Sequence, residues 1–271
     1  MNEIETGTLA NKIRRHVLRM THRARSSHIG GCFSAADLLA VLYGRILHVN
    51  PSNPTWPDRD RLIISKGHAA AAVYAALAEC GFFPMEWLDT FYLNNSQLSG
   101  HVTYGVPGVE ASTGSLGHGL SIGCGIALAG KTDGKSYKTY ALLSDGECDE
   151  GSNWEAALFA SHHHLDNITV IVDYNKYQCF GKVNEVLDLE PFSEKWRSFG
   201  WAAREIDGHD FSQIEESLSR VPFEPGKPSC IIAHTIKGKG VSFMENQLIS
   251  HYMVVDDEKL HQALAELGVT D

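Results

Sequence analysis

The chain has 271 residues, of which 43% are hydrophobic and 21% charged, and its formal net charge is −10. This composition is typical of a soluble globular protein, and the lack of a basic stripe argues against a nucleic acid partner. The N-terminus has no signal-peptide pattern, no uninterrupted apolar run reaches ~18 residues, and the six cysteines form no C-x-x-C pair, so we expect a cytoplasmic protein with no membrane partner and no disulfide framework.

Short apolar runs alternate with helical patterns along the chain. The runs predict strands at 61–65, 138–144, 168–174, 201–206 and 229–235. The stretches around them predict helices at 6–26, 34–47, 67–80, 113–130, 151–164, 193–199, 210–219 and 256–267. This alternation predicts a doubly wound α/β fold with a mainly parallel sheet and helices on both faces. Because no repeat or linker interrupts it, we expect a single domain over residues 1–271.

An acidic turn joins one predicted strand to the next helix, in "ALLSDGECDEGSNWEAALFA" (141–160). Asp145 directly follows this strand, and Asn175 follows the next one, so both are expected at the same edge of the parallel sheet, where ligands bind. Carboxylate and amide oxygens suit Mg²⁺ or Ca²⁺, which often complete their shell with phosphate, and Gly146 would let a ligand approach the backbone. Taken alone, however, this common Asp-Gly turn is better explained as a polar turn that is capped by Asp145 and needs no metal.

The wider pattern resembles the transketolase family of thiamine diphosphate enzymes. "SDGECDEGSNWEA" followed by "DYNKYQ" is similar to the family's cofactor motif, and the Glu-Gly-x-x-x-Glu-Ala spacing at 150–156 is similar to its transketolase branch. Three more segments are similar to family motifs and extend the resemblance over almost the whole chain: "SSHIGG" (26–31), "DRDRLIISKGHAAAAVYAAL" (58–77) and "GHVTYGVPGVEASTGSLGHGLSIGCGIALA" (100–129).

The resemblance implies a site for thiamine diphosphate and Mg²⁺ (or Ca²⁺). The metal ligands are expected to be the side chains of Asp145 and Asn175 and the backbone oxygen of Tyr177. The cofactor is expected to contact Gly114, Leu116, His118, Ser144, Gly146, Asn175 and His251. Expected catalytic residues are His28, His68 and His101 around the reacting centre, and Glu150 and Glu155 as a relay between paired sites. The closeness of these two glutamates to Asp145 should raise at least one pKa.

Some positions depart from the family pattern. Ser144 replaces a glycine against the diphosphate, His118 stands where glutamine is usual, and Tyr252 replaces the glycine after His251. The change at Ser144 should be tolerated, at some cost in cofactor affinity, and Tyr252 weakens the assignment of His251. The "KGKG" segment (237–240) fits either a loop beside the phosphates or a solvated turn.

The resemblance covers only the diphosphate-binding part of a transketolase. It implies the N-terminal subunit of a split enzyme that transfers a two-carbon ketol unit from a ketose to an aldose, with sugar phosphates as expected substrates. The partner would be a C-terminal subunit with the pyrimidine-binding and C-terminal domains, in a heterotetramer. Two alternatives stay open: a decarboxylating relative, similar to a deoxyxylulose-phosphate synthase or a dehydrogenase α subunit, and a catalytically silent binding module.

Overall fold

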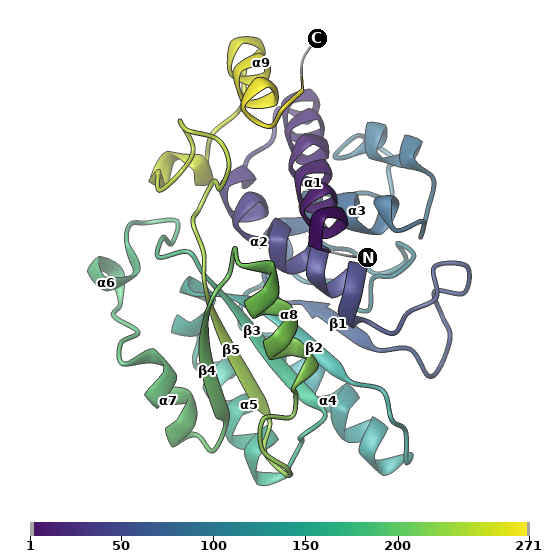
Figure 1. Ribbon diagram of the computed structural model, residues 1–271, viewed down its shortest axis with the longest axis vertical. Coiled ribbons are helices and arrows are strands. Elements are labelled where there is room, and N and C mark those ends of the chain that lie inside the picture. The colour runs from purple at the N-terminus through teal and green to yellow at the C-terminus, as the bar shows by residue number, and fades with distance from the viewer. Residues whose placement is uncertain (1–2, 270–271) are drawn as a thin grey trace.

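A parallel five-stranded sheet lies at the centre of the computed structural model, which describes residues 3–269 (Figure 1). Its strands are β1 (Arg61–Ile64), β2 (Thr139–Ser144), β3 (Ile168–Tyr174), β4 (Ala202–Asp207) and β5 (Ser229–His234). They lie in the order β1-β2-β3-β5-β4, and every pairing is parallel. All residues of β2 and β3 are buried, as expected for strands covered on both faces. The predicted α/β fold is confirmed, and each strand lies within one residue of its predicted range.

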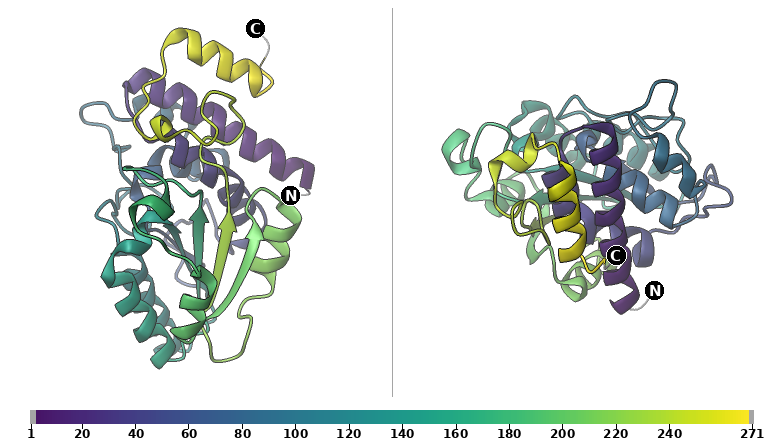
Figure 2. Two further views of the ribbon diagram at one scale, coloured as in Figure 1. Left: turned by 90° about the vertical axis from the view of Figure 1, so that its left-hand side faces the viewer. Right: turned by 90° about the horizontal axis from the view of Figure 1, so that it is seen from above.

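The order of the strands explains why helices cover both faces (Figures 1 and 2). From β1 to β4 the chain crosses the sheet in one direction, and right-handed crossovers place the helix before each next strand on one face, while the earlier helix of the β1–β2 connection packs on the other face. The step from β4 back to β5 reverses the direction and places its helix on the other face. The first face carries α4 (Gly119–Thr132), α5 (Gly151–His162) and α7 (Phe192–Ser198), with the short α6 (Val183–Val186) before α7. The second face carries α1 (Glu3–Ala24), α2 (Ile29–Val41), α3 (Ala70–Glu79), α8 (Phe211–Ser219) and α9 (Asp257–Glu266).

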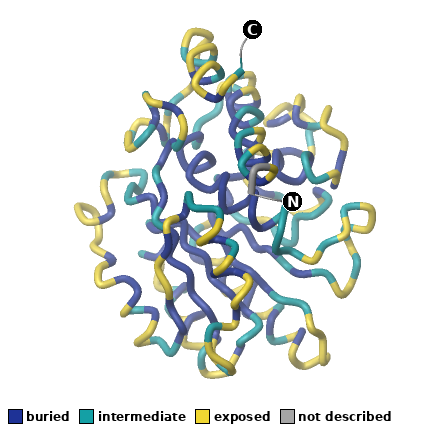
Figure 3. Tube along the Cα trace, viewed as in Figure 1, coloured by how far each residue is buried: buried dark blue, intermediate teal, exposed yellow. Residues whose placement is uncertain are grey.

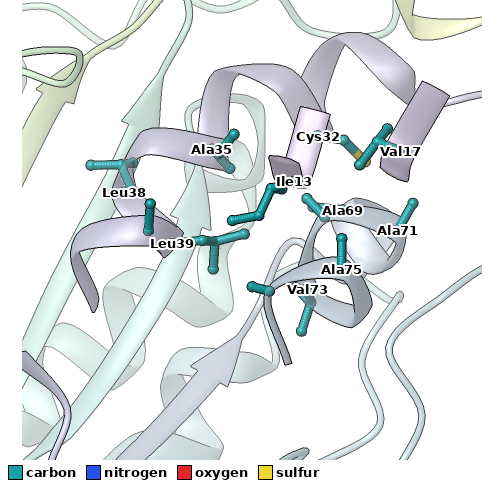
Figure 4. Close-up of a cluster of buried hydrophobic side chains, with 14 of the residues drawn as sticks. Ile13, Val17, Cys32, Ala35, Leu38, Leu39, Ala69, Ala71, Val73 and Ala75 are labelled. Atoms are coloured by element: carbon teal, nitrogen blue, oxygen red, sulfur yellow. The ribbon is translucent and has the colours of Figure 1, made fainter. Parts of the chain in front are cut away.

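Each face of the sheet has its own hydrophobic core. Along β2, Tyr140 and Leu142 belong to the core beneath α1, α2 and α3, while Ala141 and Leu143 point to the core beneath α4, α5 and α7. Figure 4 shows side chains of α1, α2 and α3 packed together in the first core. Burial of one such side chain, Ile13 at 0% exposure, contributes roughly 1.5–3 kcal/mol. The two cores hold the strand ends rigidly beneath the site.

One buried segment has the length and apolarity of a membrane span. Residues Ile29–Ile46 form an 18-residue window of mean hydropathy 1.3, although polar residues such as Ser34 and Asp37 interrupt its apolar run. The share of this window buried inside the fold is 78%, and α2 within it is buried at every residue (Figure 3). A helix covered by its own protein on all sides is also apolar all round, so we assign this segment as a core helix.

Two predicted helices begin at other residues than the sequence indicates. The helix predicted at 34–47 begins at Ile29, through Gly30 and Gly31, and ends in a π-helical turn at Leu42–Ile46. A Cβ on Gly30 would lie 2.2 Å from Ser250 Oγ, so close packing overrides the low helix propensity of glycine. The helix predicted at 113–130 begins only at Gly119, because Gly117 has a φ of 84° and ends a loop that lies along the site.

Candidate active site

The predicted site residues meet at the carboxyl ends of β2 and β3, around a cavity of about 410 Å³. All but two of them line it. They are His28, His68, His101, Gly114, Leu116, Ser144, Asp145, Gly146, Glu150, Asn175, Tyr177 and His251. A more open depression of about 640 Å³ lies over the ends of β4 and β5 and contains none of the predicted residues. The smaller cavity is therefore the candidate active site.

Oxygen atoms form one wall of this cavity. Asp145 is buried, and its carboxylate accepts hydrogen bonds from the backbone N–H groups of Gly146 and Lys176, both at 2.7 Å. The side-chain oxygen of Asn175 accepts from the N–H of Tyr177 at 3.2 Å. These bonds orient one carboxylate, one amide oxygen and one carbonyl toward the same space, the oxygen ligands that hard cations prefer. No group of three or more His, Cys, Asp and Glu side chains able to hold a metal occurs within residues 3–269, so a metal here would need the amide and carbonyl oxygens as well.

Burial raises the pKa of Asp145 to about 6, with the nearby Asp173 carboxylate adding to the shift. The carboxylate is therefore protonated in the fold at a pH where an exposed aspartate is ionised. This raised pKa favours the folded chain at low pH, and that contribution is lost as the pH rises from the ordinary value of 3.8 through about 6.

The same pKa predicts that a cation and a proton compete for Asp145. Between about pH 5 and pH 6 we expect the affinity for thiamine diphosphate with Mg²⁺ to rise by up to tenfold, and to level off above that range. Calorimetric titrations between about pH 5 and pH 8 would measure this dependence. An affinity that stays constant from pH 5 to pH 7 would contradict the assignment of Asp145 as a metal ligand.

Four histidines form another part of the cavity lining, the histidine wall. The ring of His28 lies 5.5 Å from that of His68, 5.8 Å from that of His101 and 5.0 Å from that of His251, between centroids. His28 holds this position with a left-handed backbone (φ 72°) directly before α2, and its N–H donates to the carbonyl of His251 at 2.9 Å. A non-glycine residue in this conformation is strained, which is typical of functional sites.

Three of the four histidines, His28, His68 and His251, have lowered pKa values and are uncharged at neutral pH. Burial lowers the pKa of His28 and lowers that of His68 well below its ordinary value. The pKa of His251 falls to about 3 because of burial and the positive charge of Lys237. A neutral imidazole has one N–H donor and one acceptor nitrogen, so each ring can donate to an oxyanion or exchange a proton with a hydroxyl group.

Lys237 supplies a cation inside the cavity. It is 2% exposed, and its ammonium donates to the carbonyl oxygen of Tyr177 at 3.0 Å and lies 3.3 Å from Nδ1 of His251. Burial lowers its pKa to about 8. Lys237 is the first lysine of the "KGKG" segment, which from the sequence fits either a loop beside the phosphates or a solvated turn. Because this lysine is buried, the solvated turn is wrong for Lys237. A buried ammonium needs a negatively charged partner, so Lys237 beside the oxygen ligands indicates an anionic ligand that binds together with a metal ion.

The residues present fit a metal–diphosphate group. Asp145, Asn175 and the Tyr177 carbonyl offer oxygens for the cation, and Lys237 offers positive charge for the anion. At the other end of the cavity, a Cβ on Gly114 would lie 3.0 Å from Cδ2 of His101, so glycine leaves this wall flat. The cavity therefore has a polar end and a flat end, as a cofactor with a diphosphate and an aromatic ring requires.

Two sets of buried residues support the site and were not predicted from the sequence. Lys66 is fully buried, and its ammonium pairs with Asp173, which also accepts hydrogen bonds from Ser34 and Thr235. Glu147 is also fully buried, and its carboxylate accepts hydrogen bonds from the loop before α4 and from the end of β2. An acid inside the otherwise apolar run "ITVIVDY" (168–174) is a signal for a buried partner, and it could have indicated the ion pair of Asp173.

The structure does not bring every predicted residue into the cavity. His118 is exposed just before α4 and lines a neighbouring open depression, while Glu155 is exposed on α5. Ser144 lines the cavity, but its backbone N–H donates to Glu147 rather than toward a ligand.

The expected rise in pKa occurs at other acids of the turn. The pKa values of Asp145, Glu147 and Asp149 are raised, in each case first by burial. Repulsion from another acid of the turn, the cause expected from the sequence, contributes only at Asp149, through Glu150, whereas at Asp145 the repelling acid is Asp173.

Known proteins match the chain over nearly its whole length. The family model for "Transketolase, thiamine diphosphate binding domain" matches residues 6–271. The 6-deoxy-6-sulfo-D-fructose transketolase subunit SqwG of Clostridium sp. (strain MSTE9) is 43% identical over 266 residues, which cover 98% of this chain and 97% of that protein. One subunit of the apulose-4-phosphate transketolase of Phocaeicola vulgatus is 41% identical over 267 residues, which cover 98% and 95% of the two chains.

A solved structure shows the same fold. The chain superimposes on the crystal structure of transketolase from Campylobacter jejuni with a TM-score of 0.93 at 34% identity, over 99% of this chain and 43% of that one. It therefore spans less than half of the Campylobacter enzyme and nearly all of the two subunits above. Together with the cavity at the ends of β2 and β3, these matches establish that the chain belongs to the transketolase family, of which it forms the thiamine diphosphate binding domain.

Proposed function

We propose that the chain is the diphosphate-binding subunit of a split transketolase, which transfers a two-carbon ketol unit from a ketose to an aldose. The observation that carries this proposal is the cavity that Asp145, Asn175 and Tyr177 line together with Lys237 and the histidine wall. Mg²⁺ is the proposed cation, with Ca²⁺ as a substitute, because both take oxygen ligands. Thiamine diphosphate, when bound, supplies the reactive carbon that no side chain provides.

The histidine wall gives the chain its own part in the reaction. His28, His68, His101 and His251 line the same cavity as the proposed metal ligands. Because three of these rings have lowered pKa values, they would meet sugar hydroxyl groups as neutral donors and acceptors. We expect them to orient the donor ketose and to stabilise negative charge on its carbonyl oxygen. Lys237 would hold the diphosphate end together with the metal.

The proposed substrates are sugars that carry an anionic group. The Clostridium relative is named for a sulfonated sugar and the Phocaeicola relative for a sugar phosphate. The only histidines and lysines that the described cavity offers are those assigned above, so the residues that hold this anionic group would belong to the partner subunit.

The rim of the cavity supports a partner subunit. Large apolar side chains stand exposed there, with Phe180 at 80%, Ile249 at 56% and Tyr252 at 52%. The hydroxyl group of Tyr252 donates to the carbonyl of Cys179 at 3.2 Å and ties two segments of this rim together. Exposed apolar groups around a ligand cavity are typical of a protein interface. We propose that a subunit with pyrimidine-binding and C-terminal domains covers this rim in a heterotetramer.

Activity is expected to depend on this partner. We expect the purified chain alone to show no ketol transfer, and the chain co-purified with the product of an adjacent transketolase gene to be active. Light scattering would measure the mass of both samples, and an assay with ketose donors and aldose acceptors would measure turnover. Full activity of the chain alone would contradict the split-enzyme proposal.

The same assay distinguishes the alternatives. Carbon dioxide released from pyruvate, without ketol transfer, would favour the decarboxylating relative. Failure to bind thiamine diphosphate with Mg²⁺, with or without the partner, would favour a silent binding module. His28 and His68 in the cavity lining favour ketol transfer over the decarboxylating relative, and the retained oxygen ligands Asp145 and Asn175 argue against a silent module.

A further inference from the structure

Glu147 is a fully buried carboxylate that accepts hydrogen bonds from three separate places. One oxygen, Oε1, accepts from the hydroxyl group of Ser65 and from the N–H of Gly117 at 2.9 Å. The other oxygen, Oε2, accepts from the N–H of Ser144 at 3.2 Å. The hydroxyl oxygen of Ser65 in turn accepts from the N–H of Gly119 at 3.1 Å. The side chain has 0% exposure, so all of these bonds form away from water.

These bonds join the two ends of the candidate cofactor site. Gly117 follows Gly114 and Leu116, which line the flat end of the cavity. Ser144 precedes Asp145, the proposed metal ligand at the polar end. The two oxygens of one carboxylate therefore hold the two segments at a fixed separation.

The surroundings leave little freedom for another arrangement. A Cβ on Gly119 would lie 2.3 Å from Ser65 Oγ, and one on Gly117 would lie 2.5 Å from Ser152 Oγ. Both glycines thus lie in close contact with neighbouring segments. Burying a carboxylate without a lysine or arginine in direct contact costs free energy that an apolar residue would avoid. Such a costly group is expected where its two oxygens are needed together.

We propose that Glu147 is a positioning residue that sets the distance between the diphosphate end and the ring end of the cofactor site. This inference rests on the proposed function, because it concerns the binding of thiamine diphosphate. We call the hydrogen bonds of Glu147 with Ser65, Gly117 and Ser144 the clamp. The proposal predicts that weakening the clamp lowers the affinity for a ligand that spans both ends and leaves the affinity for a ligand at the metal–diphosphate end alone nearly unchanged. Inorganic pyrophosphate with Mg²⁺ is such a short ligand.

The test compares two ligands on variants of the complex with its partner subunit. Glu147→Gln preserves the shape but offers one oxygen, so in either orientation an NH₂ group faces an N–H donor. Leaving such a buried donor unpaired is expected to raise the Kd of thiamine diphosphate with Mg²⁺ roughly tenfold or more, while the Kd of pyrophosphate with Mg²⁺ changes less than about threefold. Ser65→Ala removes only a hydroxyl group, and it should also raise the ratio of the Kd of thiamine diphosphate to the Kd of pyrophosphate. The double variant should be less than additive, because both changes affect one network.

A matched control lies one residue away. Cys148→Ala shortens a buried side chain of the same turn, whose thiol donates to the carbonyl of Ser144 at 3.5 Å, so it destabilises the turn without removing any hydrogen bond of Glu147. We expect an unchanged ratio of the two affinities, and denaturant unfolding would report stability for every variant. If Glu147→Gln fails to fold, Ser65→Ala carries the same comparison.

The outcomes separate the two proposals. Equal weakening of both ligands, or an unchanged ratio in both variants, would overturn the positioning role and leave the proposed function standing. A wild-type complex that binds pyrophosphate as tightly as thiamine diphosphate would also overturn it, because the ring end would then contribute nothing. A wild-type complex that binds neither ligand with Mg²⁺ would remove the proposed function itself.

Discussion

Replacing Asp145 by alanine is expected to abolish metal-dependent binding of thiamine diphosphate while the chain stays folded. Asp145 is the one carboxylate in the proposed ligand set, and Asn175 and the Tyr177 carbonyl carry no charge to replace it. Mutating a residue that only hydrogen-bonds to a metal ligand typically lowers the affinity for the metal by about 10–100-fold. Losing the ligand itself should therefore lower the affinity for the metal–cofactor pair by more than about 100-fold. Isothermal titration of the complex with Mg²⁺ and thiamine diphosphate would measure this loss.

Stability should change little in the same variant, because two effects oppose each other. Raising the pKa of a buried carboxyl to about 6 corresponds to about 3 kcal/mol of destabilisation at neutral pH, which the alanine relieves. The N–H groups of Gly146 and Lys176 then lose their acceptor, at about 1–3 kcal/mol each. We therefore expect the free energy of unfolding without ligands to stay within about 3 kcal/mol of the wild-type value.

The control for this variant is Asp133→Ala. Asp133 is exposed after α4, and its removal changes the net charge by the same amount. It should bind the cofactor as the wild type does. Unchanged cofactor affinity in Asp145→Ala would show that the metal binds elsewhere, whereas lost affinity together with an unfolded chain would show that the carboxyl group is needed for folding.

The strands of this protein can be predicted from its sequence because their pattern is simple. A run such as "ITVIVDY" is apolar on both faces, and strand–helix alternation then leaves few topologies with parallel pairing. The places where ligands bind follow from the same geometry, since Asp145 and Asn175 each come directly after a strand. The positions of the oxygen ligands were thus accessible from the sequence.

The supporting residues were not accessible, because they depend on contacts between distant segments. Glu147 shares a turn with Asp149 and Glu150, and nothing in the local pattern distinguishes the buried acid from the exposed one. Lys237 lies in a polar segment, and only the folded chain shows that its ammonium reaches the carbonyl of Tyr177. The starts of α2 and α4 were misjudged for the same reason, since glycines there serve tertiary packing rather than helix propensity.

Lys237 and the histidines together explain how the site can handle negative charge without a charged histidine. Burial, together with the ammonium that lies 3.3 Å from Nδ1 of His251, lowers the pKa of that imidazole and keeps it neutral. Positive charge is thus concentrated where a diphosphate would bind, and neutral donors are left where a sugar would bind. A positively charged imidazolium at the proposed sugar position would attract the carboxylates of the acidic turn. A neutral imidazole ring there remains available to the hydroxyl groups of a sugar.

His28→Ala and His101→Ala are expected to lower turnover strongly while the cofactor still binds. The two rings lie 5.8 Å apart in the cavity lining, and neither belongs to the proposed ligand set of the metal or to the proposed diphosphate contacts. A lost proton-transfer or oxyanion contact corresponds to about 3–5 kcal/mol, or about 10²–10⁴-fold in kcat. An alanine at position 28 would also relieve backbone strain if it left the left-handed region. Asparagine tolerates that region, so His28→Asn removes the imidazole while the backbone conformation stays the same. This variant therefore separates the effect of the ring from the effect of the backbone.

The readouts are kcat and KM of the complex, the Kd of thiamine diphosphate with Mg²⁺, and the unfolding midpoint of each variant. His261→Ala is the matched control, because His261 is exposed on α9 and far from the cavity lining. We expect His28→Asn to lose turnover like His28→Ala, with cofactor Kd within about threefold of the wild type, because the imidazole and not the backbone carries the role. Normal kcat in both alanine variants would return these rings to a purely structural role, and turnover recovered in His28→Asn would assign the effect to the backbone of residue 28.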